Sequence, residues 1–162
     1  EVLGMKVWHQ ACVLDTNSPS AKTAAALKCL EFDGQTEVLW TGSDSGMVTG
    51  LQNPSYDRIV RYKACDGPIK ALFPSKHAIT AVSADVISSH TRGGLLKKRW
   101  GVQDFKNITA AVQPISRGPM MVLGGEGKEL VSVDLSKQSV VSRHESKESH
   151  TTVFARGSRS LC

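Results

Sequence analysis

The sequence has no long hydrophobic run, few cysteines and few aromatic residues. No apolar stretch approaches the ~20 residues that a membrane-spanning helix needs, so we expect no membrane span. The first ten residues lack the basic start and apolar middle of a secretory signal, so we expect no export signal within them. Four scattered cysteines form no Cys-x-x-Cys pair, which favours reduced thiols in a cytosolic or nuclear protein over a disulfide framework or structural zinc site.

Sequence motifs for catalysis are also missing. No G-x-S-x-G elbow occurs, and Gly124–Lys128 has the wrong spacing for a phosphate-binding loop. The isolated histidines, His9, His77 and His90, are expected at the surface or at sheet edges. Five aspartates recur near expected turns, where such side chains bond their own backbone. We therefore assign no catalytic residue and no metal ligand. These aspartates are Asp33, Asp44, Asp66, Asp85 and Asp134.

The composition that remains is that of an ordinary folded protein. The chain has 162 residues, of which 40% are hydrophobic and 22% charged, a balance typical of one globular domain. Twenty basic side chains against fifteen acidic ones give a net charge of +5. This excess allows an anionic partner such as RNA but does not require one.

An internal repeat dominates the middle of the chain. Val38–Ser43, Ala78–Ser83 and Met120–Gly125 are short β-prone runs that end in small residues, and their ends are spaced by 40 and 42 residues. A four-stranded propeller blade of the WD type has a period of about 40–45 residues. The repeat therefore predicts an all-β, WD40-like β-propeller fragment of about three four-stranded blades.

The repeat also divides the chain. We expect an irregular N-terminal segment over 1–25, a partial propeller over 26–143 with blades at about 26–63, 69–100 and 108–143, and a polar, disordered tail over 144–162. Turn-forming residues such as Asp33-Gly34 and Asn53-Pro54 fall between the expected strands. The Ala-rich stretch Ala21–Leu30 also contains helix formers, and we interpret it as the entry to a strand.

Three blades form an incomplete ring. Propellers close with four to eight blades, and closure removes most exposed strand edges. We therefore expect the chain to be part of a larger propeller protein, with self-assembly of several copies into a ring as the alternative.

Several short motifs carry a family resemblance when they are taken in order. The stretch from Leu27 to Arg143 resembles the N-terminal WD-repeat region of the catalytic subunit of the poly(A)-specific nuclease (PAN) deadenylation complex. The usual Gly-His and Trp-Asp dipeptides of WD repeats are absent. The motifs that carry the resemblance are Leu39–Ser43, Gly46, Pro54, Arg58, Tyr62, Asp66–Ile69, Thr91–Gly94, Leu123–Gly125 and Val133–Leu135.

The resemblance implies a function in mRNA turnover. In that family a seven-bladed propeller precedes an inactive ubiquitin-hydrolase-like domain and a DEDD-type exonuclease domain, which uses divalent metal ions to shorten poly(A) tails. The expected partners are a pseudokinase adaptor subunit, poly(A)-binding protein recruited through it, and the mRNA poly(A) tail. We expect a cytoplasmic location, including mRNA-processing bodies, and a docking and positioning role without a cofactor or chemistry in this segment. The alternative is a WD-repeat scaffold or adaptor of an unrelated complex.

Two features stand out as candidates for binding and for packing. Arg92, Lys97, Lys98 and Arg99 form a basic cluster that ends at Trp100. Such a cluster can follow a phosphate backbone and stack a base, so we assign it to RNA or partner binding. The alternative is a solvated outer strand whose lysines discourage edge pairing. Trp40 lies within an expected strand and is predicted to pack between neighbouring sheets.

Overall fold

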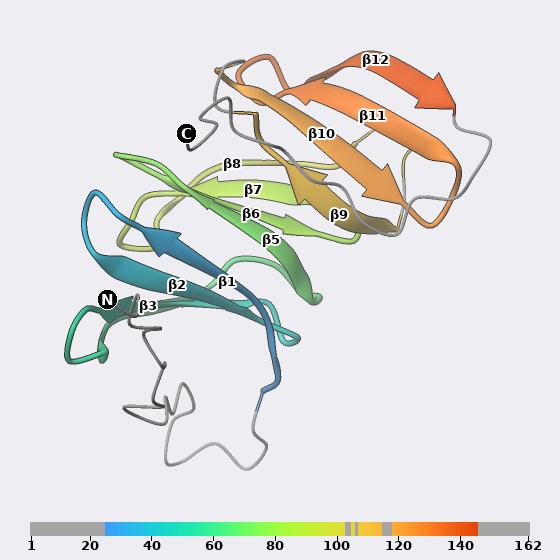
Figure 1. Ribbon diagram of the computed structural model, residues 1–162. Helices are drawn as coiled ribbons and strands as arrows, with labels where there is room; N and C mark the ends of the chain where they lie inside the picture. The colour runs from blue at the N-terminus through green and yellow to red at the C-terminus, as the bar shows by residue number, and fades with distance from the viewer. Residues whose placement is uncertain (1–24, 103–104, 106, 115–117, 146–162) are drawn as a thin grey trace, which may run out of the picture.

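The chain folds into three four-stranded antiparallel sheets, and the ring that they begin is not closed (Figure 1). The computed structural model describes residues 25–102, 105, 107–114 and 118–145. These residues contain no helix, and so none that could cross a membrane. The expected N-terminal segment and C-terminal tail lie almost entirely outside the described residues.

Each sheet takes four strands in chain order, as a propeller blade does. We call the sheets blades 1, 2 and 3. The prediction of an all-β propeller fragment with three four-stranded blades is confirmed. Blade 1 comprises β1 (Leu27–Asp33), β2 (Val38–Ser43), β3 (Met47–Gln52) and β4 (Asp57–Lys63). Blade 2 comprises β5 (Ile69–Pro74), β6 (Ile79–Ser83), β7 (Ile87–His90) and β8 (Leu96–Trp100), and blade 3 comprises β9 (Ile108–Val112), β10 (Met120–Gly125), β11 (Glu129–Asp134) and β12 (Ser139–Glu145).

The blades meet through their first strands. Strand β1 contacts β5, and β5 contacts β9, so these strands form the inner side of the arc. The last strands β4, β8 and β12 therefore lie on the outer side. This geometry puts the basic strand β8 at an outer edge, the position that the alternative interpretation of the basic cluster expects.

A hydrophobic cluster lies at each junction between blades. One cluster, built around Trp40, Val48 and Ile69, lies between blades 1 and 2. A second cluster, built around Ile87 and Leu123, lies between blades 2 and 3. The spacing of two in each strand turns alternate side chains toward the neighbouring blade, and this alternation creates the two cores.

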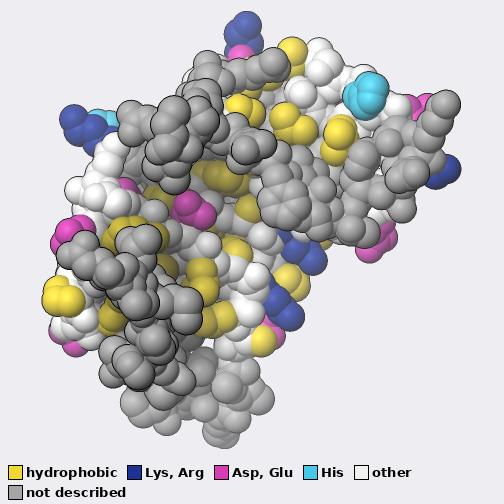
Figure 2. Space-filling model, viewed as in Figure 1, with side chains coloured by type: hydrophobic (Ala, Val, Ile, Leu, Met, Phe, Trp, Pro, Cys, Tyr) yellow, Lys and Arg dark blue, Asp and Glu magenta, His cyan; other side chains and the backbone are white. Residues whose placement is uncertain are grey.

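Other hydrophobic side chains remain at the surface. Leu30 and Phe32 on β1 are 58% and 52% exposed, and Val141 on β12 is 57% exposed. Figure 2 shows hydrophobic side chains that reach the surface on this side of the molecule. Leu30, Phe32 and Val141 lie in the first and last blades of the arc, and Leu95 and Leu96 of blade 2 are exposed as well.

One turn in blade 1 depends on glycine. Gly46 has a positive φ of 79°, and a Cβ at this position would collide with the carbonyl oxygen of Cys65. The amide of Ala64 donates a hydrogen bond to the Gly46 carbonyl oxygen over 2.9 Å. Gly46 thereby ties the β2–β3 turn to the segment that leads from blade 1 into blade 2.

His90 is buried on the inner strand β7, which corrects the expectation that it lies at the surface or at a sheet edge. Its side chain is 3% exposed and packs beside Tyr62, with 5.0 Å between the two ring centroids. Its Nε2 lies 3.1 Å from Ser88 Oγ, and its Nδ1 lies 3.4 Å from the carbonyl oxygen of Gly94. Burial lowers the pKa of His90 below its ordinary value of 6.5.

The lowered pKa of His90 predicts a loss of stability in mild acid. In the unfolded chain His90 binds a proton near pH 6.5, whereas in the folded chain it binds one only at a lower pH. We therefore expect the free energy of unfolding to fall as the pH drops below 6.5, with a slope of at most about 1.4 kcal/mol per pH unit from this group. Urea titrations from pH 7.5 to about 5 measure this slope. His90→Gln should reduce the slope and His77→Gln, at an exposed position, should not; an equal slope in all three proteins would contradict the prediction.

Candidate binding groove between blades 2 and 3

The structure divides the predicted basic cluster into three environments. Arg92 lies in the β7–β8 turn and extends toward blade 1, whereas Lys97, Lys98, Arg99 and Trp100 lie on β8. Successive residues of a regular strand point to opposite faces of a sheet, which separates Arg99 from Lys98 and Trp100. The ladder between β7 and β8 is irregular at Lys97, which has no partner on β7, and Lys97 lines the same groove as Lys98. The five residues therefore do not form one binding surface.

Arg92 connects blade 2 to blade 1. Its Nη1 donates to Asp33 Oδ2 over 2.7 Å and to the Ser75 carbonyl oxygen over 2.9 Å, and its Nη2 donates to Thr36 Oγ1. Its guanidinium lies 5.2 Å from the centre of the Trp40 ring, within cation–π distance. The Arg92 guanidinium is thus engaged by these contacts, and it links blade 2 to blade 1.

Asp33 is held as a carboxylate by this link and by its own turn. Burial alone would raise the pKa of Asp33, but hydrogen bonds from Thr36, Arg92 and the Gln35 amide outweigh it, so the pKa lies below its ordinary value. Asp134 has a similar turn role, since its Oδ1 accepts hydrogen bonds from the Ser136 and Lys137 amides. The prediction that these two aspartates serve turns is confirmed.

Arg99 points away from the other cations of β8. Its Nη2 lies 3.3 Å from Asp66 Oδ2, in an ion pair whose two side chains are 45% and 81% exposed. A pair this exposed stabilises the fold little. Arg99 is therefore a surface residue on the side of β8 that faces blade 1.

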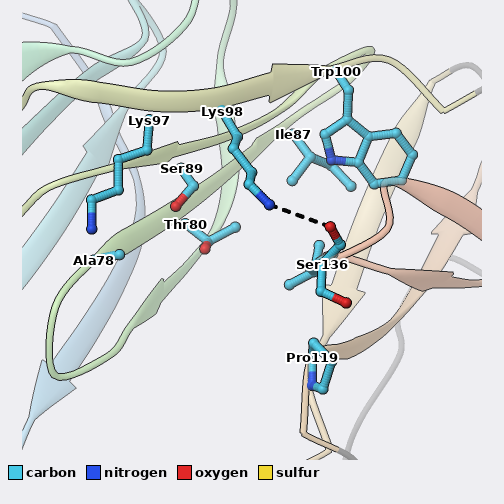
Figure 3. Close-up of a pocket in the computed structure, with 10 residues that line it drawn as sticks. Ala78, Thr80, Ile87, Ser89, Lys97, Lys98, Trp100, Pro119 and Ser136 are labelled. Carbon is cyan, nitrogen blue, oxygen red and sulfur yellow. Dashed lines mark hydrogen bonds between the residues drawn. The ribbon is translucent and has the colours of Figure 1, made fainter.

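The remaining three residues of the cluster line one groove. Lys97, Lys98 and Trp100 face a space of about 310 Å³ between blade 2 and blade 3 (Figure 3). Lys98 Nζ donates to the Ser136 carbonyl oxygen across the groove over 3.3 Å, and Lys97 Nζ donates to the His77 carbonyl oxygen over 3.4 Å. The other lining residues are Ala78, Thr80, Ile87, Ser89, Pro119, Leu135 and Ser136.

The groove is apolar inside and basic at its edge. Ile87, Leu135 and the Trp100 ring provide its hydrophobic surface, and no ion pair joins Lys97 or Lys98 to a carboxylate among the described residues. Sequence reasoning missed the half that blade 3 contributes, because Pro119, Leu135 and Ser136 carry no charge pattern. The repeat spacing could have located them, since it predicts which turns of neighbouring blades meet.

The described residues offer little reactive chemistry. No group of three or more His, Cys, Asp or Glu side chains among them could hold a metal ion. Burial raises the pKa of the Cys29 thiol to about 11 and also raises that of Cys65, so both thiols stay protonated at neutral pH. The geometry favours binding at the groove.

The sequence relatives of the chain include catalytic subunits of one complex. No protein-family model matches it. The PAN2-PAN3 deadenylation complex catalytic subunit PAN2 of Phaeosphaeria nodorum is 27% identical over 160 residues, and that of Schizosaccharomyces pombe is 22% identical over 158 residues. These matches cover 96% and 98% of the chain but only 14% of each relative, so the chain spans about one seventh of their length.

Solved structures show the same fold. The Neurospora crassa Pan2 WD40 domain matches 80% of the chain with a TM-score of 0.70 and 16% identity, and the chain covers 41% of that domain. The β-propeller domain of Myceliophteria thermophila Cps50 (Swd1) matches 76% of the chain with a TM-score of 0.64 and 12% identity. At these identities both matches show the architecture alone. The chain is therefore similar in sequence, over almost its whole length, to part of the PAN2 catalytic subunits, and it has the fold of a WD40-propeller segment.

Proposed function

We propose that the chain is a docking and positioning module of a cytoplasmic complex that shortens mRNA poly(A) tails. The observation that carries the proposal is the match to PAN2 catalytic subunits over almost the whole chain. Propellers of this kind expose turns and inter-blade grooves around a rigid scaffold, an arrangement suited to holding partners.

The contacts of the described residues support a binding role. Asp33 and Asp134 are engaged in turns, and both described cysteines have raised pKa values. The groove beside Lys98 combines an apolar interior with basic groups that no described acid neutralises. We assign the removal of adenosines to a separate exonuclease domain with divalent metal ions, and the partners to a pseudokinase adaptor and, through it, poly(A)-binding protein.

The proposal is tested on the protein that carries this chain, tagged in its own cells. We expect a PAN3-type subunit to copurify with it, and we expect poly(A) tails to lengthen when the gene is removed. Re-expression of the intact protein is the control and should restore tail length. Copurification with other proteins, together with unchanged tails after removal, would contradict the proposal.

A second candidate function is a scaffold in an unrelated complex. The likeness to the Cps50 (Swd1) propeller supports it, because the same architecture occurs there at 12% identity. A fold alone hosts many functions. The copurified proteins and the tail lengths distinguish the two candidates.

A further inference from the structure

The two junctions between blades are built differently at equivalent positions. In blade 1, Trp40 on β2 pairs with Gly50 on β3, which pairs with Val60 on β4. In blade 2, the same register brings Thr80 on β6 opposite Ser89 on β7 and Ser89 opposite Lys98 on β8. Thr80, Ser89 and Lys98 therefore occupy the places of Trp40, Gly50 and Val60.

At the first junction the Trp40 indole fills this place. Trp40 is 1% exposed, and a Cβ at Gly50 would lie only 3.1 Å from its ring, so the glycine makes room for it. The guanidinium of Arg92 from the next blade lies over the ring, 5.2 Å from its centre. One aromatic side chain thus closes the space between the two sheets.

At the second junction the corresponding place is open. Thr80 is much smaller than tryptophan, and on the blade 3 side Pro119 and Leu135 line the space, with no arginine among the lining residues. The result is the groove of about 310 Å³, near the lower end of the ~300–1,000 Å³ range of ligand pockets. The first junction indicates what such a space accepts, namely a large apolar or aromatic side chain.

The two lysines at the edge of the groove indicate the charge of the side chains that it binds. Arg92 at the first junction is paired with Asp33, whereas no ion pair joins Lys97 or Lys98 to an acid in the described part of the chain. Both lysines are exposed at the edge of the groove and are held only by carbonyl oxygens. Carboxylates beside the inserted side chain would complement these two charges.

We propose that the groove between blades 2 and 3 binds a short acidic segment of a partner protein. One large apolar side chain of that segment, preferably aromatic, inserts beside Trp100 and over Thr80, and its flanking carboxylates contact Lys97 and Lys98. The inference deepens the docking role proposed above and rests on it. The test of this inference measures peptide binding directly. A negative result therefore differs from a failure of the proposed function, which would be seen as a protein that does not copurify with a deadenylase.

The observations favour a peptide over RNA. A nucleic-acid track needs cations spaced along a backbone, but Arg92 and Arg99 are engaged with Asp33 and Asp66 away from the groove. Only two lysines remain beside an interior that is mainly hydrophobic. A buried apolar anchor with a charged rim is the usual pattern of a peptide-binding site.

The probe is a fluorescein-labelled peptide with one central tryptophan between runs of aspartate and glutamate, titrated with the 162-residue chain in fluorescence anisotropy. We expect saturable binding that weakens with salt. Replacement of the central tryptophan by serine, or of the acidic runs by lysine, should weaken it roughly tenfold or more. No binding of the acidic tryptophan peptide, or equal binding of the serine peptide, would overturn the proposal.

Variants of the chain locate the binding site. Thr80→Trp places in blade 2 the side chain that blade 1 carries and should lower affinity roughly tenfold or more by filling the groove. The double charge reversal Lys97→Glu with Lys98→Glu changes only exposed side chains and should have a similar effect. Arg99→Glu, on the same strand but the opposite face, is the matched control and should stay within about twofold.

Two results would show that the groove is not a site for acidic peptides. If the double charge reversal left the peptide affinity unchanged, the peptide would bind elsewhere on the chain. This result is decisive even if the Thr80→Trp variant does not fold. Tight binding of an oligoadenylate that the double reversal abolishes, with no binding of the acidic peptide, would assign the groove to RNA.

Discussion

Replacement of Trp40 by alanine is expected to lower the free energy of unfolding by about 3–5 kcal/mol. The side chain is 1% exposed and lies at the centre of the cluster between blades 1 and 2. Its removal loses the buried indole and leaves a cavity that the strands on either side cannot close. Urea unfolding followed by circular dichroism measures the effect.

Trp40→Phe is the matched control for this prediction. The ring remains, and the substitution also removes the indole Nε1, a buried donor without a hydrogen-bond partner among the described residues. We therefore expect a cost below about 1.5 kcal/mol. A loss under about 1 kcal/mol for Trp40→Ala would mean that the indole is not part of the core.

Arg92→Ala should cost about 2 kcal/mol. The Arg92 and Asp33 side chains are 23% and 10% exposed, between the exposed pairs worth about 0–1 kcal/mol and the buried ones whose breakage costs about 3–5 kcal/mol. The substitution also removes the cation above Trp40. A double-mutant cycle with Asp33→Asn, which keeps a turn-forming side chain, isolates the pairwise contribution.

Acid should weaken the same pair. Because the pKa of Asp33 is lower in the folded chain than its ordinary value of 3.8, its contribution is present above about pH 4 and is lost as the pH falls through the folded pKa. The stability difference between the original chain and Asp33→Asn should therefore shrink at low pH.

The control for Arg92→Ala is Arg99→Ala, which removes one side of an exposed pair and should cost under about 0.5 kcal/mol. An equal cost for Arg92→Ala would contradict the inter-blade link.

The fold could be predicted because its signals are local and repeated. Small residues at Ser43, Ser83 and Gly125 mark the ends of equivalent strands, and turn residues such as Asp33-Gly34 separate them. Hydrogen bonding within each blade joins strands that are neighbours in sequence, so short-range patterns suffice. Even the ambiguous Ala-rich stretch leads into strand β1, which begins at Leu27.

The candidate site was harder to predict because it depends on contacts between blades. Sequence proximity grouped Arg92 with Lys98, but the β7–β8 turn directs Arg92 toward Asp33, fifty-nine positions away. His90 similarly resembles a surface residue until Tyr62 of the preceding blade covers it. Alternation along β8 predicts that Lys98 and Trp100 share a face, and only the neighbouring blade shows that this face borders a groove.

The unequal junctions have a consequence for how such a protein can evolve. Its blades share one backbone plan, yet the side chains at each junction differ. A tryptophan lies beneath an arginine at one junction, and a threonine and a leucine line an open groove at the other. Exchange, duplication or loss of a single blade would bring together faces that do not match. Gene rearrangements that treat the repeats as interchangeable are thereby disfavoured, and the order of the blades is fixed by the chemistry between them.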